Sequence, residues 1–146
     1  MTSTPSPAAD APSDARAFRL RKHADYQRVY KASRKQFAKQ MTYFFMLREG
    51  SEAATPRVGL TVGKVMGKAV ERNRIKRRMR EAVRKNLALL TLPVDVVLHP
   101  RKSVIDLEFA VLEREVALVF RAVQRAAGAQ QRSTDNRQAA TGNSNA

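Results

Sequence analysis

Residues 68–90 repeat apolar side chains at helical spacing, and this pattern constrains the fold more than any other segment of the chain. One stripe of this helix consists of Ile75, Met79, Ala82, Asn86 and Leu90, which are apolar except for Asn86, with Val83 and Leu87 beside it. At about 100° per residue, the opposite stripe carries Asn73, Arg77, Arg80 and Arg84, flanked by Arg74 and Lys76. We therefore predict an amphipathic helix that packs on a second layer and leaves an arginine-rich face exposed. Pro93 prevents the helix from continuing.

Shorter patterns predict the remaining elements. Runs of β-branched and aromatic residues predict strands over 41–47, 57–62 and 94–98, with a turn over 48–51 and a loop over 64–67. Apolar residues at i, i+3 and i+4 predict helices over 23–32 and 107–126. Residues 1–15 and 128–146 carry too little apolar material to order themselves, so we predict disordered tails around one folded domain over 16–127.

The charge of the chain is concentrated in two blocks. There are 28 Lys and Arg against 13 Asp and Glu, which gives a net charge of +15. Residues 16–39 hold nine basic residues and one acidic residue, and residues 64–85 hold ten basic residues and two acidic residues. A single block of this kind is often only a solvated helix face. Two such blocks favour a binding face for a polyanion, because uncompensated like charge destabilises a compact domain.

Several function classes lack the residues they need. The chain has no cysteine and only two histidines, His23 and His99, and no apolar run approaches the roughly 20 residues of a membrane helix. We find no nucleophile–base set, no paired carboxylates in an apolar setting and no phosphate-binding glycine loop, so we expect no catalytic residue and no metal site. Glu71 and Glu81 lie among arginines and are expected to orient them. We expect a soluble cytoplasmic protein that meets nucleic acid.

The basic residues suit RNA in particular. Arginine forks on an exposed helix bind phosphate oxygens bidentately and fix register without reading sequence. Tyr26 and Tyr30 lie beside a basic block, where their rings could stack on single-stranded bases or simply pack in the core, and periodicity alone does not decide between the two. Four further cations could extend the same surface or could be solvated charges: Lys64, Lys68, Arg101 and Lys102.

The string AVERNRIKRRMREAVR, residues 69–84, resembles the RNR signature of the protein subunit of bacterial ribonuclease P. Three more stretches are similar to that family in order and spacing, so that the resemblance covers residues 18–125: DYQRVYK (25–31), RVGLTVGKVMGKA (57–69) and DVVLHPRKSVIDL (95–107). The resemblance implies a two-layer α/β (α+β) sandwich of order αβββαβα, related to a ribosomal-protein domain and with a left-handed βαβ crossover. It also implies one more strand, from splitting residues 36–47.

The resemblance further implies a function. Together with a catalytic RNA subunit, such a protein forms the endonuclease that removes the 5′ leader of precursor tRNA, with the active site in the RNA and magnesium held mainly by RNA phosphates. Contacts to the catalytic RNA are carried over to Arg72, Asn73, Arg74, Lys76, Arg77 and Arg80. Contacts to the leader and nearby backbone are carried over to Tyr26, Tyr30, a strand aromatic (Phe45 or Tyr43), Lys64, Lys68, Arg101 and Lys102. The expected partners are the RNase P RNA and precursor tRNA, with no membrane and no further protein required.

Other interpretations of the same residues remain open. A ribosomal or general RNA-binding protein with the same fold explains the charge but gives no role to the residues assigned to the leader. A DNA-binding regulator with residues 68–90 in the major groove explains the arginines but lacks a helix-turn-helix pair. An autonomous protein nuclease lacks acid–base and metal-binding residues.

Overall fold

The part of the chain that the structure describes forms seven main elements. The computed structural model describes residues 18–48 and 55–144, with side chains described as far as Ser133. The elements are α2 (His23–Ala32), β1 (Gln36–Phe37), β2 (Met41–Leu47), β3 (Arg57–Leu60), α3 (Ala69–Asn86), β4 (Val94–Pro100) and α4 (Phe109–Ser144), joined by the short 3₁₀ turns η2 (Lys64–Met66), η3 (Leu87–Leu89) and η4 (Lys102–Ile105). The order αβββαβα is confirmed, and β1 is the additional strand. The predicted N-terminal tail, and the predicted turn beyond Arg48, lie outside the described residues.

The four strands make one mixed sheet in the order β1-β2-β4-β3. β2 pairs antiparallel with both β1 and β4, whereas β3 pairs parallel with β4. Parallel neighbours need a long crossover connection, and α3 supplies it between β3 and β4. At its other edge, β3 is partly covered by the segment before α2, since the Leu20 amide donates to the Val58 carbonyl at 2.9 Å.

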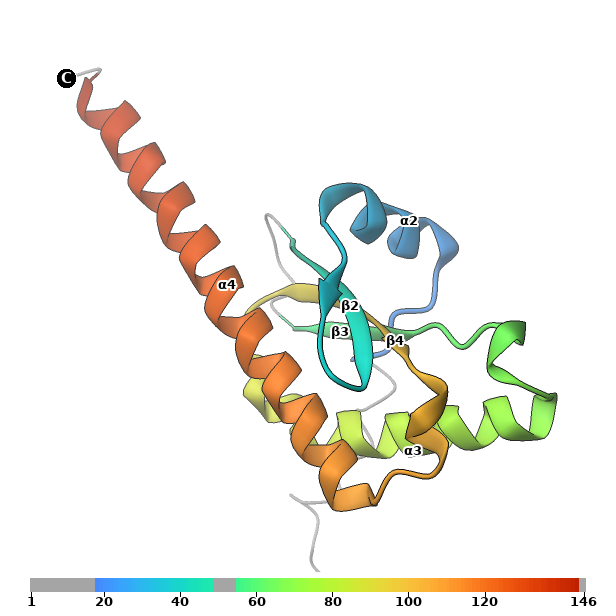
Figure 1. Cartoon of the computed structure of the whole chain (residues 1–146). Helices are drawn as coiled ribbons and strands as arrows, with labels where there is room; N and C mark the ends of the chain where they lie inside the picture. Colours follow the sequence, from blue (N-terminus) through green and yellow to red (C-terminus); the bar gives the residue numbers. More distant parts are fainter. Residues whose placement is uncertain (1–17, 49–54, 145–146) are drawn as a thin grey trace, which may run out of the picture.

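Helices lie on both faces of the sheet (Figure 1): α2 covers one face, and α3 and α4 cover the other. The larger core, with Ile75 and Phe120 fully buried, fills the space between the sheet and α3 and α4. A smaller cluster of Leu20, Val29 and Val97 lies under α2. The expected two layers therefore describe the main core, and α2 adds a third layer on the opposite face. β4 lies between both clusters, which explains its nearly continuous apolar sequence.

The arginine helix forms as predicted. Ile75, Met79 and Ala82 of its apolar stripe are completely buried. The Asn86 amide ends the helix by donating to the carbonyl of Ala82 at 2.9 Å and to that of Glu113 in α4 at 3.0 Å. α3 is therefore tied to α4 at the end opposite its signature residues.

The last helix is longer than the sequence predicts. α4 runs to Ser144, so the predicted tail over 128–146 begins inside a helix rather than after one. The segment has no apolar stripe, but it also has no proline and is rich in Ala, Gln and Arg, which favour helix. Ala127 is the last buried residue among the side chains that the structure describes. Within the described residues, no helix is long and apolar enough to cross a membrane.

Candidate nucleic-acid interface

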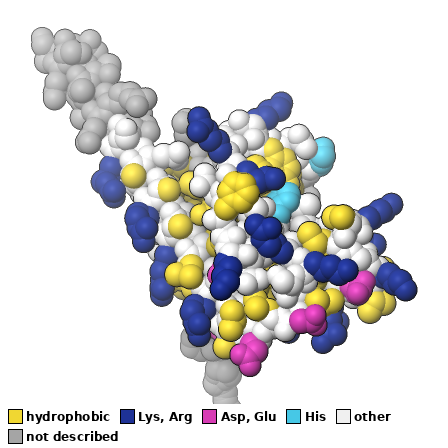
Figure 2. All heavy atoms as spheres, in the orientation of Figure 1, with side chains coloured by type: hydrophobic (Ala, Val, Ile, Leu, Met, Phe, Trp, Pro, Cys, Tyr) yellow, Lys and Arg dark blue, Asp and Glu magenta, His cyan; other side chains and the backbone are white. Residues whose placement is uncertain are grey.

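The outward face of α3 presents its basic side chains to solvent, as the spacing predicts. Asn73, Arg74, Arg77 and Arg80 are exposed, and Lys76 is partly exposed. Four of these predicted contacts come together around a shallow groove of about 450 Å³, which is lined by Val70, Asn73, Lys76, Arg77 and Arg80. Lys and Arg side chains are spread widely over the face seen in Figure 2, with few acidic ones between them.

Arg72 is used in part by the fold itself. Its Nε donates to the Gly67 carbonyl at 3.2 Å, across a turn in which Gly67 has a φ of +127°, a conformation that L side chains rarely adopt. Glu71 accepts the Lys68 amide at 2.8 Å and so caps the helix instead of orienting an arginine. Glu81 does pair with an arginine, Arg84. The start of α3 is therefore held rigidly, and Lys68 and the first signature residues with it.

A larger cleft of about 920 Å³ connects this helix to α2 and the sheet. Its apolar floor and basic rim are made by Phe18, Arg19, Leu20, Arg21, Tyr26, Val58, Leu60, Arg77, Arg80, Glu81, Val83, Arg84 and Leu87. Tyr26 is half-buried in it, and its hydroxyl donates to the carbonyl of Leu20 at 3.1 Å, with the carbonyl of Leu60 as a second acceptor at 3.4 Å. The ring lies so close to Gly59 that a Cβ there would be 2.5 Å from the hydroxyl. Tyr26 thus both lines the cleft and anchors the segment before α2.

The second tyrosine belongs to an aromatic cluster on the α2 face of the sheet. Tyr30 contacts Phe44 edge-on, with ring centroids 4.9 Å apart, and His99 lies 5.8 Å from Tyr30 and 5.4 Å from Phe44. The Tyr30 hydroxyl is 3.0 Å from His99 Nε2 and 3.3 Å from Thr61 Oγ1. Burial lowers the pKa of His99 below its usual 6.5, and the positive charge of Lys35 acts in the same direction. The imidazole of His99 extends the ring surface of the cluster.

The strand aromatic that contacts Tyr30 is Phe44, whereas Phe45 and Tyr43, which were expected at the leader site, lie on the other face of the sheet. Both of these rings contact the core under α3 and α4, on the opposite face of the sheet. Side chains of a strand alternate between its faces, so neighbours in the run Tyr43–Phe44–Phe45 cannot share one. Because three aromatic residues follow one another, the sequence does not show which of them faces α2. The pairing of β2 with β4 shows that it is Phe44.

The four predicted cations outside α3 lie beyond one end of the sheet. β3 and β4 are parallel with Leu60 opposite Leu98, so the chain segments that follow both strands leave the sheet at the same end. Exposed Lys64 and Lys68 follow β3, and exposed Arg101 and Lys102 follow β4 directly. Arg78 ties the second group to α3, because its guanidinium donates to the carbonyls of Val104 at 3.1 Å and of Leu107. The Tyr30 hydroxyl contacts Thr61 and His99 near the ends of these two strands, so the aromatic cluster lies at the same end of the sheet as the two segments.

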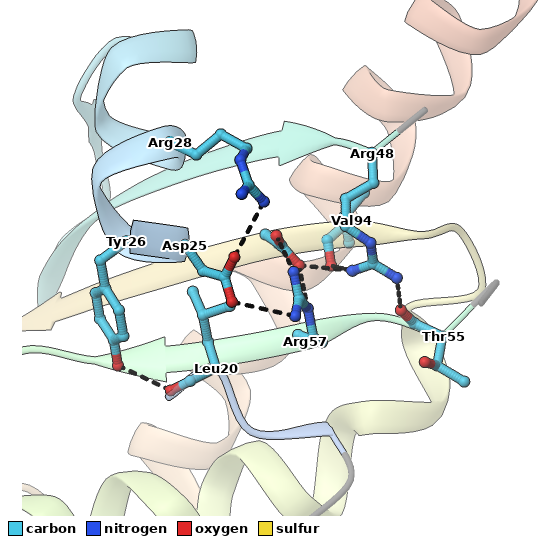
Figure 3. A network of polar contacts seen from close by, with 9 residues as sticks. Leu20, Asp25, Tyr26, Arg28, Arg48, Thr55, Arg57 and Val94 are labelled. Atoms are coloured by element: carbon cyan, nitrogen blue, oxygen red, sulfur yellow. Dashed lines mark hydrogen bonds and ion pairs between the residues drawn. The ribbon is translucent and has the colours of Figure 1, made fainter. Parts of the chain in front are cut away.

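A chain of ion pairs, which the sequence analysis did not find, attaches α2 to the sheet (Figure 3). Arg57 donates to both carboxylate oxygens of buried Asp95, at 2.9 and 2.8 Å, and to Asp25 of α2 at 3.3 Å. Arg48 also pairs with Asp95 at 2.6 Å, and Arg28 with Asp25 at 3.0 Å. Most of the paired residues are far apart in the sequence, so no local pattern reveals these pairs. The one indication is Asp95 itself, because an aspartate inside the apolar run 94–98 needs a buried partner of opposite charge.

These carboxylates do not form a metal site. In the part of the chain that the structure describes, no three His, Asp or Glu side chains gather in a way that could hold a metal ion. Asp25 and Asp95 are bonded to arginines, whose charge opposes a cation. Asp25 and Asp95 are therefore not suited to hold a magnesium ion.

The fold and this surface define a class: a basic α+β domain with an exposed arginine helix on one side of the sheet and an aromatic cluster on the other, features that are typical of nucleic-acid-binding proteins. Comparison with known proteins then gives the family. The family model described as Ribonuclease P matches residues 15–124. The chain is 42% identical over 89 residues to the ribonuclease P protein component of Desulforapulum autotrophicum, covering 61% of this chain and 74% of that one. It is 37% identical over 94 residues to that of Finegoldia magna, covering 64% and 80%.

Solved structures agree with this. The Staphylococcus aureus RNase P protein superposes with a TM-score of 0.62 at 27% identity, covering 73% of this chain and 95% of that one. The RNase P protein of Thermotoga maritima, at 24% identity, shares the fold with the same TM-score over 71% and 96%. The chain belongs to the ribonuclease P protein family. It is a protein subunit of the RNase P ribonucleoprotein, an endoribonuclease of tRNA processing that also contains the RNase P RNA.

Proposed function

We propose that this subunit binds the 5′ leader of precursor tRNA on the α2 face of the sheet while α3 contacts the catalytic RNA. The observation that carries the proposal is the aromatic cluster of Tyr30, Phe44 and His99, which lies on the same face of the sheet as Tyr26 and at the end of the sheet where the segments with the cations after β3 and β4 begin. Rings that stack on bases, next to cations that follow a backbone, are what an unpaired RNA strand requires.

The proposed division of labour follows the two surfaces. Contacts to the catalytic RNA are assigned to the α3 face: Arg72, Asn73, Arg74, Lys76, Arg77 and Arg80. Contacts to the leader are assigned to Tyr26, Tyr30 and Phe44, with Lys64, Lys68, Arg101 and Lys102 near the RNA backbone. Arg77 and Arg80 line both grooves, so the two RNAs would meet along this ridge.

The mechanism is electrostatic and selective rather than chemical. The catalytic RNA and precursor tRNA are both polyanions, and a chain of net charge +15 between them lowers their repulsion and the salt they need. Mature tRNA has no leader, so stacking in the cluster strengthens binding only before cleavage and does not slow product release. We propose that the magnesium ions and the reacting groups are held by the RNA, and that the complex works in the cytoplasm.

Two substitutions in one strand test the leader site. Phe44→Leu removes a ring from the aromatic cluster, and Phe45→Leu removes the neighbouring ring from the other face as a matched control. In the holoenzyme reconstituted with a bacterial RNase P RNA, we expect Phe44→Leu to weaken precursor tRNA binding by about 1–3 kcal/mol and to leave mature tRNA binding unchanged. Equal losses for both RNAs, or equal losses from both substitutions, would contradict the proposal.

A cleavage assay at low magnesium tests the role of the subunit. We expect removal of the 5′ leader by the mixture of protein and catalytic RNA, and none by the protein alone. Cleavage by the protein alone would indicate a catalytic site in this chain. Absence of any rescue of the RNA would instead favour general RNA binding.

A further inference from the structure

The edge strand β1 exposes an aromatic ring that neither the core nor the proposed leader site uses. Phe37 is 71% exposed, although a large apolar side chain on a folded domain is usually more buried. Its neighbour Ala38 contacts the main core, so β1 is held in place while the ring of Phe37 points away from that core.

The register places Phe37 on the same face as the aromatic cluster. Phe37 pairs with Thr42 in β2, and Thr42 pairs with His99 in β4. Directly paired residues point to the same side of a sheet, so these three side chains form a row across it. His99 is in contact with Tyr30 and Phe44. The row therefore leads from the aromatic cluster to the sheet edge.

The surroundings of β1 are basic. Exposed Arg34 and Lys35 precede the strand and exposed Lys39 follows it, and no acidic residue occurs from Ser33 to Leu47. Lys35 lies near enough to His99 for its charge to lower the pKa of that imidazole.

We propose that Phe37 stacks on a leader nucleotide farther from the cleavage site than those held by Tyr30 and Phe44, with Arg34, Lys35 and Lys39 following the phosphates. This inference rests on the leader site proposed above and extends it to the edge of the sheet. Strands lie about 4.8 Å apart, so Phe37 is roughly 10 Å from His99 across β2. That distance corresponds to about three stacked nucleotides at about 3.4 Å each.

A polyanion fits this edge better than an added protein strand does. β1 has only two residues, and lysines flank it, which are two of the devices by which proteins block pairing at an edge. A neighbouring strand would gain few hydrogen bonds here and would leave three cations without a partner of opposite sign. An RNA strand neutralises them and covers the exposed ring at the same time.

The test varies leader length and the ring together. Phe37→Ala and Phe37→Trp are compared with Leu118→Ala, which truncates another exposed apolar side chain, 55% exposed on α4. Binding to the reconstituted holoenzyme is measured for precursor tRNAs whose leaders are shortened one nucleotide at a time. We expect Phe37→Ala to weaken binding of precursor tRNAs with long leaders about five-fold. The effect should disappear once the leader no longer extends roughly three nucleotides beyond the nucleotides whose binding depends on Phe44. Phe37→Trp and Leu118→Ala should bind like the parent chain.

The outcomes are separable from failure of the leader site itself. If Phe44→Leu weakens binding at every leader length while Phe37→Ala never does, the extension is wrong and the leader site stands. If Phe37→Ala weakens mature tRNA binding equally, the ring contacts something other than the leader, which overturns the proposal. A change only in self-association of the protein, measured by sedimentation velocity, would assign Phe37 to a contact between copies and would overturn it as well.

Discussion

Arg57 is predicted to be the side chain on which the attachment of α2 most depends. It makes two hydrogen bonds to Asp95, whose side chain is 0% exposed, and one to Asp25, whose side chain is 9% exposed. Removing one partner of a buried ion pair costs about 3–5 kcal/mol, because the other charge is left without compensation. Arg48 still pairs with Asp95 after Arg57→Ala, and Arg57 itself is 27% exposed. We therefore expect a decrease of about 2–3 kcal/mol in the free energy of unfolding.

The assay is thermal and urea unfolding of Arg57→Ala beside Arg28→Ala. Arg28 pairs with the same Asp25 but is 54% exposed, so its removal should cost no more than about 0.5 kcal/mol. For a domain of this size, the two values correspond to a fall in melting temperature of roughly 6–12 °C and of about 2 °C or less. Precursor discrimination should fall with Arg57→Ala, because α2 carries the tyrosines. Equal decreases in stability for the two variants would refute the reasoning.

Three further predictions concern other parts of the molecule. Gly59→Ala places a Cβ 2.5 Å from the Tyr26 hydroxyl, so it should lower the free energy of unfolding by about 1–3 kcal/mol in urea titrations, and unchanged stability would contradict the packing. The pKa of His99 is lowered in the folded protein, so the unfolded chain binds a proton at this residue more readily. The contribution of His99 to the free energy of unfolding is therefore complete above pH 6.5 and is lost as the pH falls below that value. His99→Asn should remove this part of the pH dependence of unfolding, whereas the same change at exposed His23 should preserve it. Arg77→Ala should lower the salt dependence of binding to the catalytic RNA, by roughly 0.7–0.9 in log–log slope for each phosphate that is no longer neutralised, and an unchanged slope would place Arg77 outside the interface.

Local physics made much of the architecture predictable from the sequence. A helix with an apolar stripe and an arginine stripe leaves little choice about which side faces the core, and Ile75 and Met79 are buried while Arg77 and Arg80 are exposed. The strands over 41–47 and 94–98 were equally clear, because β-branched and aromatic runs between turn residues carry their own signal. The edge strand β1 followed only from the family resemblance, since two residues are too few for any periodicity. The full length of α4 was missed because Ala, Gln and Arg favour helix without marking it by a pattern.

The tertiary structure decided which side chains share a surface. Whether Phe44 or Phe45 faces α2 depends on the register of β2 against β4, and a shift by one residue would exchange the two. The ion pairs of Arg57 join residues 32 and 38 positions apart, and the row from Phe37 to His99 crosses three strands. The sequence by itself determined most of the elements and the sign of the charge, because these depend on neighbours along the chain. The aromatic cluster, the cleft and the row from Phe37 to His99 depend on neighbours in space, which only the folded chain brings together.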